Sequence, residues 1–208
     1  MRCLNGMMYF GWSEDREADI AEEAAAVGMA MRLAPGDPYA HYALAIHSNS
    51  VAQPDQAIAA AQRAIDVSPS FALAHFILGV SRIWAGRAAL AIEPMQRGFR
   101  LNPNDPQSFV WMHFLALAHI LSGEHAEAAE RAAETVAMRS DSHLGYAMLA
   151  CSLSYLGREA EARRALDEML RVQPKAGALD DLIGRFTVPT ERALFQAGLR
   201  RAGWFGAA

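Results

Sequence analysis

The sequence predicts an all-α fold built from a repeated helix–turn–helix unit. Proline residues that end one unit recur at a fixed interval of about 34 residues, at Pro35, Pro69 and Pro103. Pro174 follows after two further intervals and three extra positions. Small residues that would let helices approach closely keep the same interval in two series: Ala45, Gly79, Ala116 and Ala150, and Ala57, Ala91, Ala128 and Ala162. Self-similarity of this kind indicates a stacked array of repeats.

One repeat is clearest between residues 72 and 105. An apolar run from Leu73 to Trp84 ends at Ala85-Gly86, and a second run from Ala88 to Leu101 ends at Asn102-Pro103. Gly86, Gly123 and Gly157 mark the turn between the two helices of successive copies. Every series gains three residues between the second and third full copies, which places an insertion at residues 106–108.

Composition limits the class of protein. With 52% hydrophobic and 20% charged residues, the 208-residue chain can bury a sizeable core as one continuous array. The net charge of −4 and the lack of a basic run argue against a nucleic-acid partner. Cys3 and Cys151 form no CxxC motif, which favours buried thiols in a reducing compartment.

The sequence also indicates where the protein is located. The first residues lack the long apolar core and cleavage site of a secretory signal. The longest strongly apolar stretch, residues 109–121, is too short to span a bilayer. We therefore expect a soluble, cytoplasmic protein with no membrane partner.

The chain divides into three parts. Residues 1–36 form a partial N-terminal repeat: the stub of a first helix, then a helix capped by Ser13 that runs to Leu33. Residues 38–176 hold four repeats, at 38–71, 72–105, 109–142 and 143–176. Residues 177–208 form a C-terminal capping segment with a short helix at 179–185 and a final helix at 191–202. Pro94 lies within the second helix of the second repeat, where we expect a kink.

The N-terminal stub is rich in apolar side chains. Met7, Tyr9, Phe10 and Trp12 are too apolar to face water without a cover. A preceding domain, a second subunit or a folded-back segment would supply that cover. Homo-oligomerisation through the N-terminal end is one of these alternatives.

Residues 4–176 resemble the tetratricopeptide repeat (TPR) proteins in their period, their small-residue positions and their Gly and Pro positions. The position that usually holds Trp departs from the family pattern, since it is His41, His75, Met112 and Tyr146 here. The resemblance implies a right-handed α–α superhelix, the TPR solenoid, and a role in protein–protein interaction.

A narrower resemblance is carried by FGWSEDREADIAEEA near the start, by LNPNDP at residues 101–106 and by ERALFQAGLRRAGW near the end. These stretches are similar to the region behind the catalytic domain of bacterial class III adenylate cyclases, and behind the winged-helix domain of some bacterial regulators. An alternative function follows from it: a regulatory part of a cyclase-like signalling protein, with catalysis in a domain absent from this chain.

No group of residues predicts catalysis. His113, His119 and His125 lack the i, i+4 spacing of a helical metal site. The run Ser140-Asp141-Ser142-His143 contains the residue types of a hydrolase triad, but adjacent residues at a turn between helices are typical capping residues. We expect no enzymatic activity, no cofactor and no metal.

In TPR proteins the first helix of each repeat lines a concave groove, through positions i, i+3, i+7 and i+10. Carried onto this sequence, the resemblance implies a groove that is apolar and aromatic and lacks the Lys, Asn and Arg residues that grip a peptide carboxylate. Its predicted partner-binding residues are Tyr39, Tyr42, Ile46, Phe76, Val80, Ile83, Trp84, His113, Leu117 and Tyr155. The expected ligand is an apolar or amphipathic protein segment. The alternative is that tight winding, or the C-terminal helix, buries these side chains as core.

Overall fold

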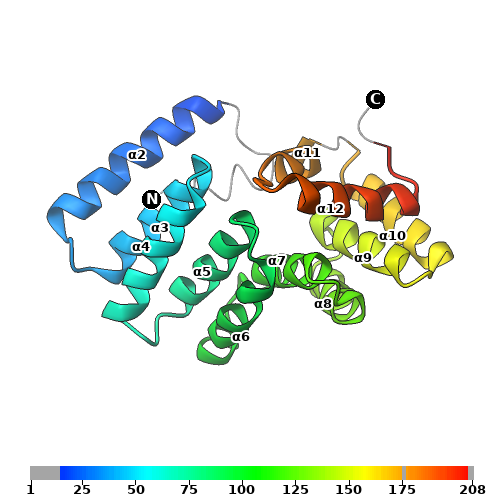
Figure 1. Ribbon diagram of the computed structural model, residues 1–208, viewed down its shortest axis with the longest axis horizontal. Coiled ribbons are helices and arrows are strands. Elements are labelled where there is room, and N and C mark those ends of the chain that lie inside the picture. The colour runs from blue at the N-terminus through cyan, green and yellow to red at the C-terminus, as the bar shows by residue number, and fades with distance from the viewer. Residues whose placement is uncertain (1–14, 175–176, 206–208) are drawn as a thin grey trace. The chain divides into compact units, whose positions relative to one another are not determined.

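The computed structural model describes residues 15–174 and 177–205, and all the regular structure within these ranges is helical (Figure 1). The chain divides into two compact units, the first ending at Pro103 and the second beginning at Asn104. The division comes just before the predicted insertion at residues 106–108. The expectations for the apolar stub, including Met7 and Trp12, lie outside the described residues.

The first unit is a series of antiparallel helices (Figure 1). Each helix packs against the next, and α3 also contacts α5. The elements are α2 (Arg16–Leu33), α3 (Pro38–Ser50), α4 (Pro54–Val67), α5 (Ala72–Trp84), the 3₁₀ helix η1 (Ala88–Ala91) and α6 (Ile92–Leu101).

The second unit continues the helix–turn–helix pattern and adds two helices. Its elements are α7 (Ser108–Leu121), α8 (His125–Met138), α9 (His143–Tyr155), α10 (Glu159–Val172), α11 (Gly177–Gly184) and α12 (Pro189–Ala202). The last helix departs from simple succession, because α12 packs against α9, α10 and α7.

Side chains cap several helices as the sequence suggests. Asp37 accepts a hydrogen bond from the backbone N–H of Tyr39 at 2.8 Å, with Pro38 at the first helical position. Ser142 accepts from the N–H of Gly145 at 3.1 Å. The first described helix is capped by Asp15, which accepts from Ala18, so the expectation of a cap at Ser13 was wrong.

The turn inside each repeat requires a left-handed residue. Gly86, Gly123 and Gly157 have φ values of 72°, 79° and 72°. At the same place in the first repeat, Ala52 has a φ of 57°, a conformation that costs a residue with a Cβ about 1–2 kcal/mol. Because its N–H and that of the next residue close the same hydrogen-bonded turn, Ala52 ends its helix like the glycines.

Pro94 acts at the beginning of a helix. The second helix of that repeat starts as η1 and becomes α-helical only at Ile92, so Pro94 lies in the first turn of α6, where proline is tolerated. The expected kink well inside a long helix was therefore wrong. The carbonyl oxygen of Leu90, which an N–H at position 94 would reach in a regular helix, accepts a hydrogen bond from Nη1 of Arg82 at 2.6 Å.

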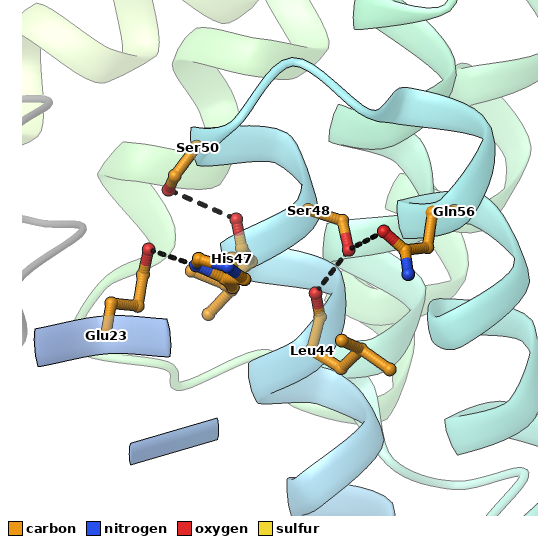
Figure 2. A network of polar contacts seen from close by, with 7 residues as sticks. Glu23, Leu44, His47, Ser48, Ser50 and Gln56 are labelled. Atoms are coloured by element: carbon orange, nitrogen blue, oxygen red, sulfur yellow. Dashed lines mark hydrogen bonds and ion pairs between the residues drawn. The ribbon is translucent and has the colours of Figure 1, made fainter. Parts of the chain in front are cut away.

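Small residues form the contact between paired helices. Both predicted series are buried, and a Cβ added to Gly79 would overlap Cγ of Met95 in α6. One period before Ala57 this position holds Glu23, which is also buried. Oε2 of Glu23 lies 3.2 Å from Nδ1 of His47 in α3, a pairing visible in Figure 2. A buried carboxylate needs such a partner, because transfer from water costs several kcal/mol without one.

Candidate functional site

The predicted stripe on α3 begins in a cluster of three rings, of which Tyr39 is exposed and the other two are half-buried. The side chain of Tyr39 is 61% exposed, and its ring centroid lies 4.5 Å from that of Phe71. The ring centroid of Tyr42, one turn further along α3, lies 5.8 Å from that of Phe71 in an edge-on arrangement. We call Tyr39, Tyr42 and Phe71 the aromatic cluster. Its most accessible part is the Tyr39 ring.

The stripe becomes buried towards the end of α3. Ile46 is half-buried, and Asn49, three residues on, is 6% exposed. Nδ2 of Asn49 donates to Oγ of Ser81 at 3.0 Å, and this bond fastens α3 to α5. The α3 stripe therefore offers a surface only over its first two turns.

On α5 the predicted groove residues are inside the unit. The ring of Phe76 has no exposed surface and packs at right angles to Phe99, 4.9 Å away, in α6. Gly98 leaves the space that this ring fills. The other α5 residues of the stripe are at most 3% exposed, and they are Val80, Ile83 and Trp84. Their side chains therefore form part of the core of the first unit.

In the second unit, His113 and Leu117 of α7 are also buried. Nε2 of His113 lies 2.6 Å from Oγ of Ser142, the cap of α9, so the imidazole joins α7 to the start of α9. Burial, with a smaller contribution from His143, lowers the pKa of His113 to about 3. The imidazole is therefore neutral near pH 7.

The inner face of α9 is covered by α12. Three side chains of α9 make hydrogen bonds to backbone carbonyl groups of α12. The hydroxyl of Tyr155 donates to the carbonyl of Leu194 at 2.6 Å. The hydroxyl of Ser154 lies 2.8 Å from the carbonyl of Gly198, and Sγ of Cys151 lies 3.7 Å from that of Phe195.

The two helices touch closely because residue 198 has no side chain. A Cβ on Gly198 would overlap Sγ of Cys151 and would lie 2.7 Å from Cε2 of Tyr155. The Tyr155 ring is stacked on His125 of α8 at 4.4 Å, and the guanidinium of Arg201 lies 5.0 Å from its centroid. Burial raises the pKa of the Cys151 thiol, which keeps it protonated under this cover.

The other residues considered for catalysis or metal binding have structural roles. Ser142 caps a helix, and Asp141 forms a two-bond ion pair with Arg139 on the surface. His119 pairs with Glu124 at 2.6 Å across the turn that follows α7. Within residues 15–174 and 177–205, no three His, Cys, Asp or Glu side chains are grouped to hold a metal ion. Over the same ranges, no helix has the length and apolarity needed to cross a membrane.

Sequence reasoning missed two features of this surface. Phe71 was assigned to the end of a repeat, although its place directly before α5 lets it bridge the two tyrosines. Cys151 and Ser154 lie on the same face of α9 as Tyr155. Burial by the C-terminal helix was one alternative for this face, but the pattern did not predict the hydrogen bonds that these side chains make to it. Both features depend on contacts between elements that periodicity does not specify.

Comparison with solved structures identifies the fold. PilW, a type IV pilus biogenesis factor, matches with a TM-score of 0.70 and 15% identity over 97% of this chain and 90% of its own. A thermophilic TPR protein of Thermus thermophilus matches at 0.65, with 19% identity over 95% and 96%. YrrB, described as a TPR protein with an unusual peptide-binding site, matches at 0.60, with 16% identity over 85% and 90%.

These likenesses confirm the predicted all-α TPR fold. No protein-family model matches the sequence, and no curated protein does. The resemblance to the region behind class III adenylate cyclase domains stays a prediction from the sequence.

Proposed function

We propose that this protein is a regulatory protein–protein interaction module that binds an apolar or amphipathic segment of a partner through the inner stripes of its repeats. The observation that carries the proposal is the aromatic cluster at the open end of the α3 stripe. Exposed tyrosine rings of this kind concentrate binding energy at protein interfaces. The fold supports the same class of function, since YrrB is described as having a peptide-binding site.

The predicted residues divide into a contact surface and a support. Tyr39, Tyr42 and Ile46 would touch the ligand, because they are the accessible members of the α3 stripe. The buried members on α5, namely Phe76, Val80, Ile83 and Trp84, would hold this surface in shape. His113, Leu117 and Tyr155 belong to the second unit, where α12 lies on the same stripe.

The chemistry of the surface indicates the class of ligand. The aromatic cluster contains no cation, and Asp37 is the nearest charged residue along α3. The three side chains of the cluster offer an acidic tail no ion pair, whereas an apolar or amphipathic segment could bury its side chains against their rings. Binding should therefore depend little on salt, because exposed ion pairs are what salt screens.

A partner recovered by affinity purification would be titrated against Tyr39→Ala, Tyr42→Ala and the control Leu90→Ala. Leu90 is 59% exposed in η1, away from the stripe, so the control removes comparable apolar surface. Losing an aromatic anchor costs about 2 kcal/mol, so each tyrosine variant should bind about thirtyfold more weakly.

Calorimetry at two salt concentrations measures the loss of affinity in the tyrosine variants and the salt dependence of binding. Unchanged affinity in both tyrosine variants, or a loss equal to that of Leu90→Ala, would place the binding surface elsewhere.

A further inference from the structure

The second unit already holds a helix where the repeat pattern predicts a ligand. In the first helix of the fourth repeat, the spacing i, i+3, i+7 and i+10 that the TPR resemblance assigns to the groove starts at Leu144 and includes Cys151 and Ser154. The predicted groove residue Tyr155 lies beside them, and we call this set the α9 stripe. All three side chains contact α12, as described above. The chain therefore provides its own occupant for this face.

The contacts define what kind of ligand the face accepts. The hydrogen bonds end on backbone carbonyl groups at 194, 195 and 198, which occupy one face of any α-helix. The face restricts the amino-acid sequence of a bound helix at two kinds of position. Position 198 must lack a Cβ, and Phe195 and Leu199 supply fully buried apolar anchors.

Away from this face, α12 is charged at its C-terminal end. Arg200 and Arg201 are exposed there. An amphipathic helix with a central glycine therefore satisfies all the contacts that the face makes. Such a helix is a common ligand of apolar grooves, with anchors one turn apart.

We infer that α12 is an intramolecular ligand that regulates the second unit: it blocks the α9 face until an amphipathic helix with the order Phe-x-x-Gly-Leu displaces it. The inference rests on the proposed function, because it takes the inner stripes to be where partners bind. A tethered helix competes at an effective concentration of about millimolar. A free helix with the same intrinsic affinity for the α9 face would therefore bind the intact protein weakly. It would bind a protein with undocked α12 strongly.

Cys151 provides a direct readout of docking. Its thiol is fully buried under α12, so a thiol reagent reaches it only when α12 leaves. In a Cys3→Ser background, Cys151 is the one remaining thiol in the sequence. The variant Gly198→Ala forces a methyl group against Sγ of Cys151, whereas the control Gly184→Ala, in α11, adds a methyl group that meets no atom within 4 Å.

The labelling rate of Cys151 is then measured in native buffer, with circular dichroism on the same samples. Gly198→Ala should label about tenfold faster, because overpacking a contact typically costs about 1–3 kcal/mol and about 1.4 kcal/mol is a factor of ten. Gly184→Ala should label at the parent rate. Both variants should keep the helical signal of the parent.

A synthetic peptide of residues 188–204 is the probe for the vacated face. It should slow the labelling of Gly198→Ala towards the parent rate, and the same peptide with alanine at position 198 should not. Loss of the helical signal in Gly198→Ala would overturn the inference, since α12 would then be an indispensable part of the core. Fast labelling that the peptide leaves unchanged would overturn it as well.

These outcomes are independent of the partner titration, because no partner is present. If the peptide binds while the tyrosine variants keep full affinity for their partner, the proposed surface on α3 fails and this inference stands. If the tyrosine variants lose affinity and the peptide does not bind, the proposed surface on α3 stands and this inference fails.

Discussion

At the scale of single residues, backbone conformation is the most predictable property of this sequence. Glycine adopts positive φ at little cost, so Gly86, Gly123 and Gly157 identify the turn in three repeats. In the first repeat Ala52 makes the same turn, and an alanine in the sequence does not predict a left-handed conformation. Its position could be found only by counting one repeat period back from Gly86.

The strain at Ala52 leads to a prediction. Ala52→Gly should raise the free energy of unfolding by about 0.5–1 kcal/mol, since relief of the left-handed alanine exceeds the extra entropy of glycine in the unfolded chain. Gly157→Ala should lower it by a similar amount, because the turn there has the same conformation with a φ of 72° and open space for the methyl group.

Urea denaturation followed by circular dichroism measures both changes. A lower stability for Ala52→Gly would show that the alanine methyl group contributes packing that outweighs the strain.

Exposure was less predictable than conformation. Tyr42 and Phe76 occupy equivalent positions one period apart, yet Tyr42 is half-buried and Phe76 is not exposed at all. Gly98 leaves a space in α6 that the Phe76 ring fills, whereas the equivalent position in the first repeat holds Ala64. A repeat period places a residue on one face of its helix but does not say what packs on that face.

At the scale of elements, helix limits followed from capping and breaking residues. Helix α2 ends at Leu33 as expected, and the predicted final helix at residues 191–202 begins two residues earlier, at Pro189. Pro94 was harder to interpret, because its effect depends on where the helix begins. The start of α6 at Ile92 accommodates the proline, and Arg82 satisfies the carbonyl that the proline leaves without an N–H.

The contact between α7 and the start of α9 should make stability depend on pH. His113 is neutral in the folded protein, with its pKa lowered to about 3, and the unfolded chain has the ordinary value of 6.5. Between these two values the unfolded state binds more protons than the folded state. Stability is therefore fully present above pH 6.5 and is lost as the pH falls towards 3.

The slope should approach about 1.4 kcal/mol per pH unit in that window. Burial also lowers the pKa of His143, which acts in the same direction. Urea titrations from pH 7.5 to pH 4.5 on the parent and on His113→Asn would measure the difference. The variant, which carries no titrating group at position 113, should show a shallower loss, and identical slopes would contradict the assignment.

At the scale of the whole molecule, the sequence predicted the repeat architecture but not how it is used. The repeat period is a property of the chain alone, so the all-α TPR fold could be recognised without coordinates. The division at Pro103 comes just before the predicted insertion at residues 106–108, where the phase of the repeat changes. Burial of the stripes by the C-terminal helix was one of two alternatives from the sequence, and the repeat period could not decide between them, because α12 contacts α9 through residues 44 positions apart.

The two units therefore present their inner stripes in different states. The first has the aromatic cluster, in which Tyr39 is exposed, and the second has a helix bound to the α9 stripe. Our account assigns recognition of the partner to the first surface. Its central claim is that the partner lies against α3.

Site-specific photo-crosslinking tests this claim most directly. A benzophenone amino acid would replace Tyr39 or, as the control, Gln96, which is exposed on α6. The purified partner should crosslink at position 39 and not at position 96, and the crosslink at 39 should disappear when Tyr42→Ala is added. A crosslink of equal yield at position 96, or one at position 39 that survives Tyr42→Ala, would contradict the account.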